Sequence, residues 1–202
     1  MLSPGVIGQA AGLFAVTNID DIVVLALFFA QGAGIKGSAR KVAAGQYLGF
    51  AAILAVAGAA AFGATFLPEG VLPYLGLLPL ALGLRAAVRA WRDRGEDEQE
   101  TPAGPGGPGG PGILEVAAVT FANGGDNIGV YVPVFATAGA GGMIVYAGVF
   151  LVLVAVWVAL GRYFATRPVI ARALSRWGHI VLPVVLIGLG LLILIEGGAF
   201  GW

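Results

Sequence analysis

Six long apolar stretches follow one another along this chain, and short polar or charged segments separate them. Their approximate ranges are 6–33, 43–66, 71–91, 113–137, 142–164 and 179–199. Each stretch is close to or above the roughly 20 residues that an α-helix needs to cross about 30 Å of hydrocarbon. The pattern predicts an all-α, polytopic membrane protein with six transmembrane helices.

The composition agrees with this prediction. Of the 202 residues, 58% are hydrophobic and 11% are charged. A soluble protein of this size would have to hide far more apolar surface than its small core could hold. The chain has no cysteine, which excludes disulfides and thiolate metal ligands. The first stretch lacks the basic flank of a cleaved signal peptide, so we expect it to remain in the protein.

Basic residues are confined to the connections after the first, third and fifth stretches and to the ends of the stretches that lead into them. All 11 of them lie there: Lys36, Arg40, Lys41, Arg85, Arg89, Arg92, Arg94, Arg162, Arg167, Arg172 and Arg176. Six helices place these connections on one side of the membrane, and the positive-inside rule predicts that this side is cytoplasmic. Both termini are then outside, and we expect a multi-pass protein of the plasma membrane. The net charge is zero, and we expect no nucleic-acid partner.

The longest connection, residues 93–112, divides the chain into two units of three predicted helices. The first unit is residues 1–92 and the second is residues 113–202. The connection begins with an acidic run and ends in a Pro/Gly repeat. Such a segment cannot pack a core, and we predict a cytoplasmic linker.

Two polar motifs interrupt the apolar pattern near the middle of the first and fourth stretches. They are Asn18-Ile-Asp20-Asp21 and Asn123-Gly-Gly-Asp126-Asn127. A carboxylate at the bilayer centre costs roughly 2.5–3.5 kcal/mol on insertion scales. Acids kept at this cost usually bind cations or relay protons, so the motifs predict a functional site.

The two motifs coincide when the halves of the chain are superposed. An offset of 106 residues places Asp20 on Asp126 and Thr17 on Asn123. Because each unit has three helices, the second unit would enter the membrane from the opposite side. We therefore predict two inverted three-helix repeats, with a site near the midplane where they meet.

Both motifs favour a helix that bends or unwinds. Asp20 and Asp21 point about 100° apart on an unbroken helix, so a local unwinding aims them more easily at one cavity. Gly124 and Gly125 each cost about 1 kcal/mol relative to alanine in a helix. Pro133 lacks an N–H and frees a carbonyl one turn earlier. We expect a bend or break at each motif.

Oxygen atoms dominate the polar side chains of the motifs. The candidate metal ligands are the carboxylates of Asp20, Asp21 and Asp126, the amides of Asn18, Asn123 and Asn127, and the hydroxyl of Thr17. Gln46 and Tyr131 are candidate neighbours that point inward. Hard oxygen ligands suit divalent ions such as calcium or manganese, and larger ions that accept oxygen. Three carboxylates exceed a divalent charge by one, so competition with protons would couple export to proton entry.

The same residues resemble a known family. Thr17-Asn-Ile-Asp-Asp21 and the stretch from Phe121 to Phe135, with its Gly-Gly-Asp-Asn core, are similar to the two signature stretches of the cadmium resistance transporter family, within the lysine-exporter superfamily. The similarity extends over nearly the whole chain. It implies efflux of divalent metals, with cadmium as the named substrate and no resident cofactor. It also implicates Asp20, Asp21, Asp126 and Asn127.

Other functions remain open at this point. An exporter of cationic amino acids could use the same carboxylates, although no partner for the substrate's α-carboxylate is evident in the stretches. A membrane enzyme would want a serine or histidine beside the acids, and neither is nearby. A membrane assembly protein, or a buried polar network that only fixes packing, would gain little from adjacent acids that repel each other. A homodimer is compatible with so small a unit.

Overall fold

A computed structural model describes residues 4–92, 110–167, 183–196 and 199 of the chain, and helices make up its regular structure. The helices are α1 (Pro4–Thr17), α2 (Asp21–Gln31), α3 (Ser38–Ala64), the 3₁₀ helix η1 (Glu69–Gly76), α4 (Leu77–Arg92), α5 (Ile113–Asn123), α6 (Gly125–Phe164) and a C-terminal helix (Pro183–Glu196). This agrees with the predicted all-α class. The predicted linker, apart from residues 110–112, lies outside the described residues.

Two of the described helices, α3 and α6, are long and apolar enough to cross a membrane by themselves. The helices α1 and α2 are bent by 61° at the break between them, and together they have the length and composition of a broken span or of a re-entrant loop. The remaining apolar helices, which include α5 and the C-terminal helix, are shorter than a full crossing. The helices support a membrane protein, and the count of six spans stays a prediction.

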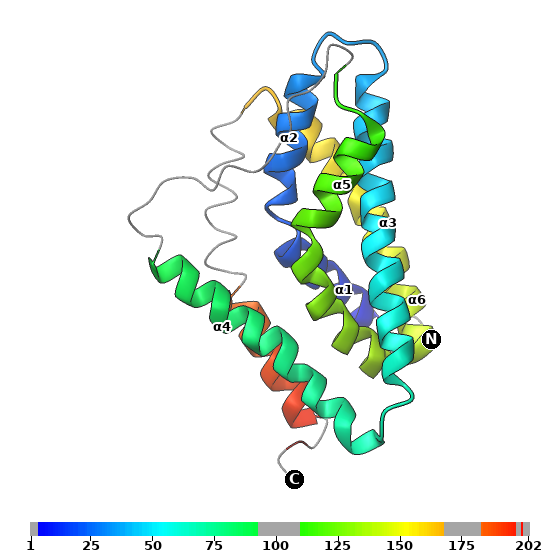
Figure 1. The fold of residues 1–202 in the computed structure, drawn as a ribbon, viewed down its shortest axis with the longest axis vertical. Coiled ribbons are helices and arrows are strands. Elements are labelled where there is room, and N and C mark those ends of the chain that lie inside the picture. Colours follow the sequence, from blue (N-terminus) through cyan, green and yellow to red (C-terminus); the bar gives the residue numbers. More distant parts are fainter. Residues whose placement is uncertain (1–3, 93–109, 168–182, 197–198, 200–202) are drawn as a thin grey trace.

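Helix α6 is a hairpin of two helical limbs. Gly139 has φ 67° and ψ 177°, a left-handed backbone conformation that favours glycine. The rings of Phe135 and Tyr146 lie 6.3 Å apart, and those of Tyr131 and Phe150 lie 4.9 Å apart. Contacts that pair earlier residues with later ones in this way require antiparallel limbs, residues 125–138 and 140–164. Figure 1 shows the chain reversing at the lower end of the bundle.

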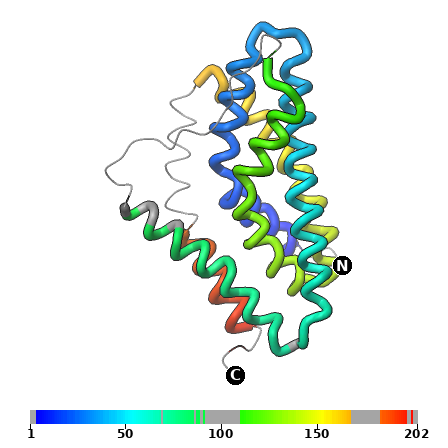
Figure 2. The backbone as a smooth tube through the Cα atoms, viewed as in Figure 1, coloured from blue at the N-terminus to red at the C-terminus, as the bar shows by residue number. Residues whose placement is uncertain are grey.

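Both predicted interruptions are present as breaks between helices. Helix α1 ends at Thr17 and α2 begins at Asp21, with a turn between them. Helix α5 ends at Asn123, Gly124 is non-helical, and α6 begins at Gly125. The tube in Figure 2 follows this path through the first break, where the axis changes direction.

The third stretch differs from its predicted single helix. Its first part is the 3₁₀ helix η1, and α4 begins only at Leu77. Pro79 lies in the first turn of α4, where the missing N–H is tolerated. Helix α3 begins at Ser38, five residues before the predicted start, because Gly37 with φ 84° ends the preceding loop there.

The core is a bundle of α1, α2, α3, α5 and both limbs of α6. Six aromatic side chains pack its lower part: Phe14, Phe50, Tyr131, Phe135, Tyr146 and Phe150. Aliphatic and phenylalanine side chains of α2, with Val42 and Val116, pack its upper part. Helix α4 and the C-terminal helix pair with each other and lean away from the bundle (Figure 1).

Small residues let α3 and α5 approach closely. A Cβ added to Gly45 would lie 2.6 Å from the carbonyl oxygen of Ile113, and one added to Gly49 would lie 2.6 Å from that of Ala117. The two glycines are four residues apart, as in membrane helix pairs that pack through small residues. This contact fixes the position of α5, and with it the side chain of Asn123.

We predict that Gly49→Ala destabilises the protein. The added methyl group meets backbone, which cannot move aside, and overpacking of this kind costs about 1–3 kcal/mol. The measurement is the midpoint of thermal unfolding in detergent, followed by tryptophan fluorescence. Gly63→Ala on the same helix is the control, because nothing lies within 4 Å of its added Cβ. Equal midpoints for the two variants would contradict the packing described.

Candidate functional site

The two helix breaks face each other and bring three site residues together. The side-chain nitrogen of Asn123, the last residue of α5, donates to Asp21 Oδ1 at 2.7 Å and to Asp20 Oδ2 at 3.2 Å. One amide from the second half of the chain therefore bridges two carboxylates from the first half. Asp21 is only 4% exposed, whereas Asp20 and Asn123 are half-buried.

Asp21 has a second polar partner on α3. Gln46 donates through Nε2 to Asp21 Oδ2 at 3.2 Å, and Thr120 donates to Gln46 Oε1 at 2.6 Å. Both partners are almost fully buried. Since Thr120 holds the amide oxygen of Gln46, the nitrogen faces the carboxylate. Three helices, α2, α3 and α5, thus fix the orientation of one aspartate.

A neutral polar cluster lies beside the carboxylates. Asn127 donates to Asn18 Oδ1 at 3.1 Å, and the nitrogen of Asn18 lies 2.9 Å from the hydroxyl of Tyr131. The hydroxyls of Thr17 and Tyr131 are 3.0 Å apart. These side chains are almost fully buried and again join the first break to the second.

The backbone carbonyl of Asn18 at the first break accepts the N–H of Asp21 at 3.2 Å and a second hydrogen bond from a distant helix. The indole nitrogen of Trp157, in the second limb of α6, donates to the carbonyl oxygen of Asn18 at 2.6 Å. A carbonyl released from a helix inside a membrane needs such a partner. The ring of Trp157 also packs edge-on against Phe14, with centroids 5.0 Å apart.

The third aspartate lies differently from the first two. Asp126 is exposed at the side of the bundle, yet its charge acts on both Asp20 and Asp21. Within the described part of the chain, no three acidic or histidine side chains are close enough together to hold one metal ion. The described arrangement is therefore a bridged carboxylate pair with a third acid nearby, and not a closed ligand cage.

Apolar packing closes the site toward both ends of the bundle. Val24, Leu25 and Phe28 follow the carboxylates on α2 toward the upper end. Phe14 and Phe150 belong to the aromatic group toward the lower end, and their rings are 5.5 Å apart. An ion that passed along the bundle would have to cross one of these layers.

The structure gathers all seven candidate ligands at the two breaks. Gln46 and Tyr131 point inward as expected. Sequence reasoning missed Thr120 and Trp157. Thr120 lies one helical turn before Asn123 and therefore on the same face of the helix, so the spacing could have identified it as a neighbour of the site. Trp157 is 139 residues from its partner, and no local pattern could have found it.

The arrangement can hold a cation through oxygen atoms. A hydrogen-bond donor, the Asn123 amide, now lies between two carboxylates, which is the position a cation would favour. Carboxylate, amide and hydroxyl oxygens are hard ligands for divalent ions. Neither methionine of the chain, Met1 nor Met143, belongs to the two motifs.

Comparison with known families agrees with the resemblance drawn from the motifs. A family model described as Cadmium resistance transporter matches residues 14–202. The matched range contains both helix breaks and all of the candidate ligands. Searches of curated proteins and of solved structures gave no match. Because the family model covers nearly the entire chain, the protein belongs to the cadmium resistance transporter family.

Proposed function

We propose that this protein is a secondary active exporter of divalent heavy-metal cations, with Cd²⁺ as its main substrate. The observation that carries the proposal is the bridge from Asn123 to Asp20 and Asp21, where the two helix breaks meet. Acids kept in an apolar bundle at a discontinuous helix are typical of ion sites in secondary transporters.

The bridge suggests how the site changes when an ion enters. In the structure the nitrogen of Asn123 separates two negative groups. Rotation of this amide by about 180° would present its oxygen to an ion between the carboxylates. Gln46 and the Asn18–Asn127 pair would hold the neighbouring side chains in place while the ion replaces the donor.

Protons complete the proposed cycle. Asp20, Asp21 and Asp126 carry one negative charge more than a divalent ion neutralises when all three are ionised. Without the ion, protons or hydrogen-bond donors must offset their mutual repulsion. Binding of metal from the cytoplasm and of protons from outside would thus exclude each other, which is the basis of exchange.

The helix bounds support an inverted repeat. With the offset of 106 residues, the end of α1 at Thr17 falls on the end of α5 at Asn123, and the start of α2 at Asp21 falls on Asn127 in the first turn of α6. Figure 1 shows the corresponding elements running in opposite directions, with α1 and α2 rising and α5 and the first limb of α6 descending. We infer six spans, with α6 contributing its two limbs to two of them.

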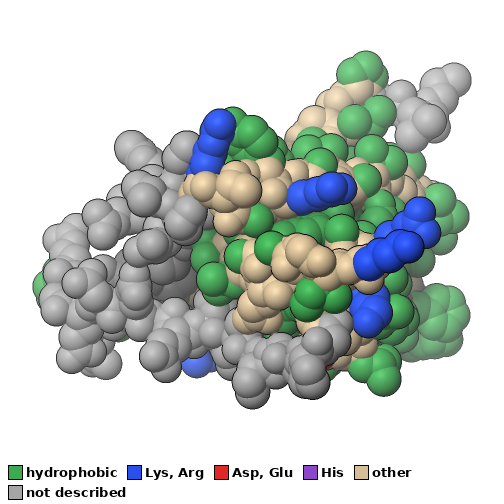
Figure 3. Space-filling model, turned by 90° about the horizontal axis from the view of Figure 1, so that it is seen from above, with side chains coloured by type: hydrophobic (Ala, Val, Ile, Leu, Met, Phe, Trp, Pro, Cys, Tyr) green, Lys and Arg blue, Asp and Glu red, His purple; other side chains and the backbone are tan. Residues whose placement is uncertain are grey.

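The distribution of basic side chains supports the orientation. Lys36, Arg40, Lys41, Arg162 and Arg167 are exposed at the upper end of the bundle, and Figure 3 shows basic side chains on this face. By the positive-inside rule we place this end in the cytoplasm and the Gly139 turn outside. The linker would then be cytoplasmic and both termini external.

We predict that Asp21→Asn and Asp126→Asn each slow metal transport. The protein is reconstituted into liposomes, and Cd²⁺ and Mn²⁺ movement is followed together with a pH-sensitive dye. The transport rate of each variant is expected to fall at least about tenfold. Loss of a residue that only orients a metal ligand already costs about that much in metal affinity or activity. In the unaltered protein, apparent metal affinity should fall as pH falls, because protons compete for the carboxylates.

Glu196→Gln is the matched control, since it removes an exposed acid at the far end of the C-terminal helix. It should transport metal at the normal rate. Normal transport rates for both aspartate variants would contradict the proposed metal site. Metal movement without any change in internal pH would contradict only the proposed exchange of metal for protons.

We also predict the sidedness of four positions. The chain has no cysteine, so single cysteines can be introduced without background labelling. A membrane-impermeant maleimide added to intact cells should label Leu67→Cys and Gly141→Cys, and should label Lys36→Cys and Thr166→Cys only after the membrane is opened. Labelling of Gly141→Cys only in opened membranes would show that α6 does not turn back on the outer side.

A further inference from the structure

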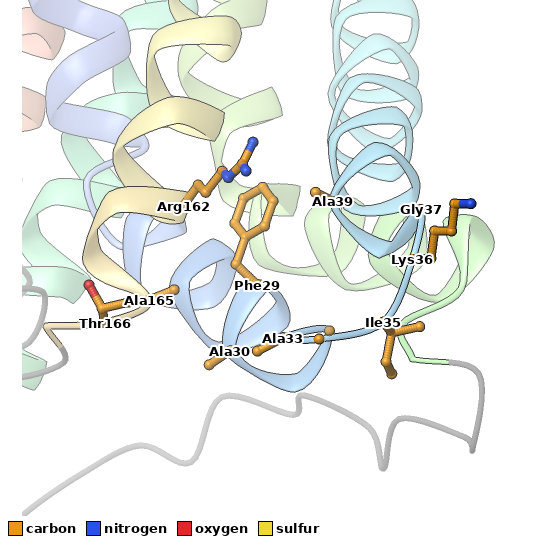
Figure 4. Close-up of a pocket in the computed structure, with 12 residues that line it drawn as sticks. Phe29, Ala30, Ala33, Ile35, Lys36, Gly37, Ala39, Arg162, Ala165 and Thr166 are labelled. Atoms are coloured by element: carbon orange, nitrogen blue, oxygen red, sulfur yellow. The ribbon is translucent and has the colours of Figure 1, made fainter.

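A cavity of about 410 Å³ opens at the upper end of the bundle, away from the carboxylate site. It lies between the loop joining α2 to α3 and the last turns of the second limb of α6. Figure 4 shows Phe29, Lys36 and Arg162 among the residues around it. The cavity therefore joins an element from the first half of the chain to one from the second half.

The lining of this cavity is amphipathic. Its apolar part is formed by Phe29, Ile35 and several alanines. Its polar part is formed by Lys36, Arg162 and Thr166, all of them exposed. Two cationic side chains from separate elements thus border a small apolar surface.

Both cations are exposed in the part of the chain that the structure describes. Among the described residues, neither Lys36 nor Arg162 forms an ion pair. Arg167 is already engaged, because it donates to the hydroxyl of Tyr163 and its guanidinium lies 4.6 Å from the centre of that ring.

The loop adds donors of its own. Within the described part of the chain, the backbone N–H groups of Lys36, Gly37 and Ala39 have no hydrogen-bond partner, and these three residues line the cavity. Unpaired N–H groups in a turn that leads into a helix favour an anion.

We propose that this cavity binds the phosphate-bearing headgroup of an anionic phospholipid from the cytoplasmic leaflet. Arg162 pairs with the phosphate oxygens beside the ring of Phe29, and the exposed Lys36, which Figure 4 shows extended away from Arg162, swings in from the far end of the loop. The surface around Phe29 and Ile35 receives the apolar part next to the headgroup. Basic pockets between membrane helices on the cytoplasmic side recognise such headgroups. A soluble phosphate would use the cations and leave the apolar lining unmatched, which favours the lipid.

A bound headgroup would tie the α2–α3 loop to the end of α6. This contact is separate from the metal site, and it requires only that the basic end of the bundle lies at the membrane surface. The lipid would therefore stabilise the protein whether or not a metal ion is bound.

The test uses the purified full-length protein in a neutral detergent with phosphatidylglycerol as the probe. Bound lipid is counted by native mass spectrometry, and the thermal midpoint is measured with phosphatidylglycerol, phosphatidylcholine or inorganic phosphate added. We expect phosphatidylglycerol to bind at least about tenfold more tightly than phosphatidylcholine and to raise the midpoint. We expect the double variant Lys36→Gln/Arg162→Gln to lose this preference.

The control variant is Arg40→Gln/Lys41→Gln, which removes two exposed charges at the same end but outside the cavity lining. It should keep the preference within about twofold. Equal loss in both double variants would show a diffuse charge effect and overturn the proposal. Unchanged binding in Lys36→Gln/Arg162→Gln, or equal stabilisation by inorganic phosphate, would overturn it as well.

Both altered side chains are exposed, so we expect the cavity variant to fold. If its midpoint without lipid is lowered, Arg162→Gln and Arg162→Lys are compared instead. The lysine variant should keep the preference for phosphatidylglycerol, and the glutamine variant should weaken it. Equal binding by the two would again overturn the proposal.

Discussion

Two adjacent carboxylates inside an apolar helical bundle repel each other unless a donor, a proton or a cation lies between them, and the site is organised around that constraint. A straight helix would point Asp20 and Asp21 about 100° apart, whereas here α1 ends before them and α2 begins at Asp21. Asn123 reaches both because α5 ends at that residue. The helix break in the first half of the chain therefore lies against the helix break in the second half, and polar side chains from the two breaks bond to each other.

Packing in the rest of the bundle keeps the two helix breaks in contact. Gly45 and Gly49 let α5 lie against α3 closely enough for Thr120 to hold Gln46, which in turn contacts Asp21. Trp157 adds a second hydrogen bond to the carbonyl of Asn18 at the first break. Aliphatic and aromatic layers lie above and below the buried Asp21, and this apolar surrounding strengthens its electrostatic interactions. In the proposed transport cycle, these layers would have to part in turn.

Much of this arrangement could be predicted from the sequence, because apolar length and interrupted polarity are local signals. The breaks at Asp20 and Gly124 followed from buried charge and from paired glycines. The start of α3 at Ser38 could not be predicted, because Arg40 and Lys41 are equally compatible with a loop and with a helix end outside the lipid. The exposure of Asp126 and the role of Trp157 depend on how distant helices pack, and no spacing in the chain encodes that.

The central claim is that side chains from both breaks hold one divalent ion through oxygen. X-ray absorption of the Cd²⁺-loaded protein at the cadmium edge, with the bound metal counted per chain, tests it most directly. The account predicts one ion with oxygen ligands and no sulfur, lost in both Asp21→Asn and Asp126→Asn, which alter one half each. Sulfur from Met143 in the coordination shell, or one ion still bound in either variant, would contradict it.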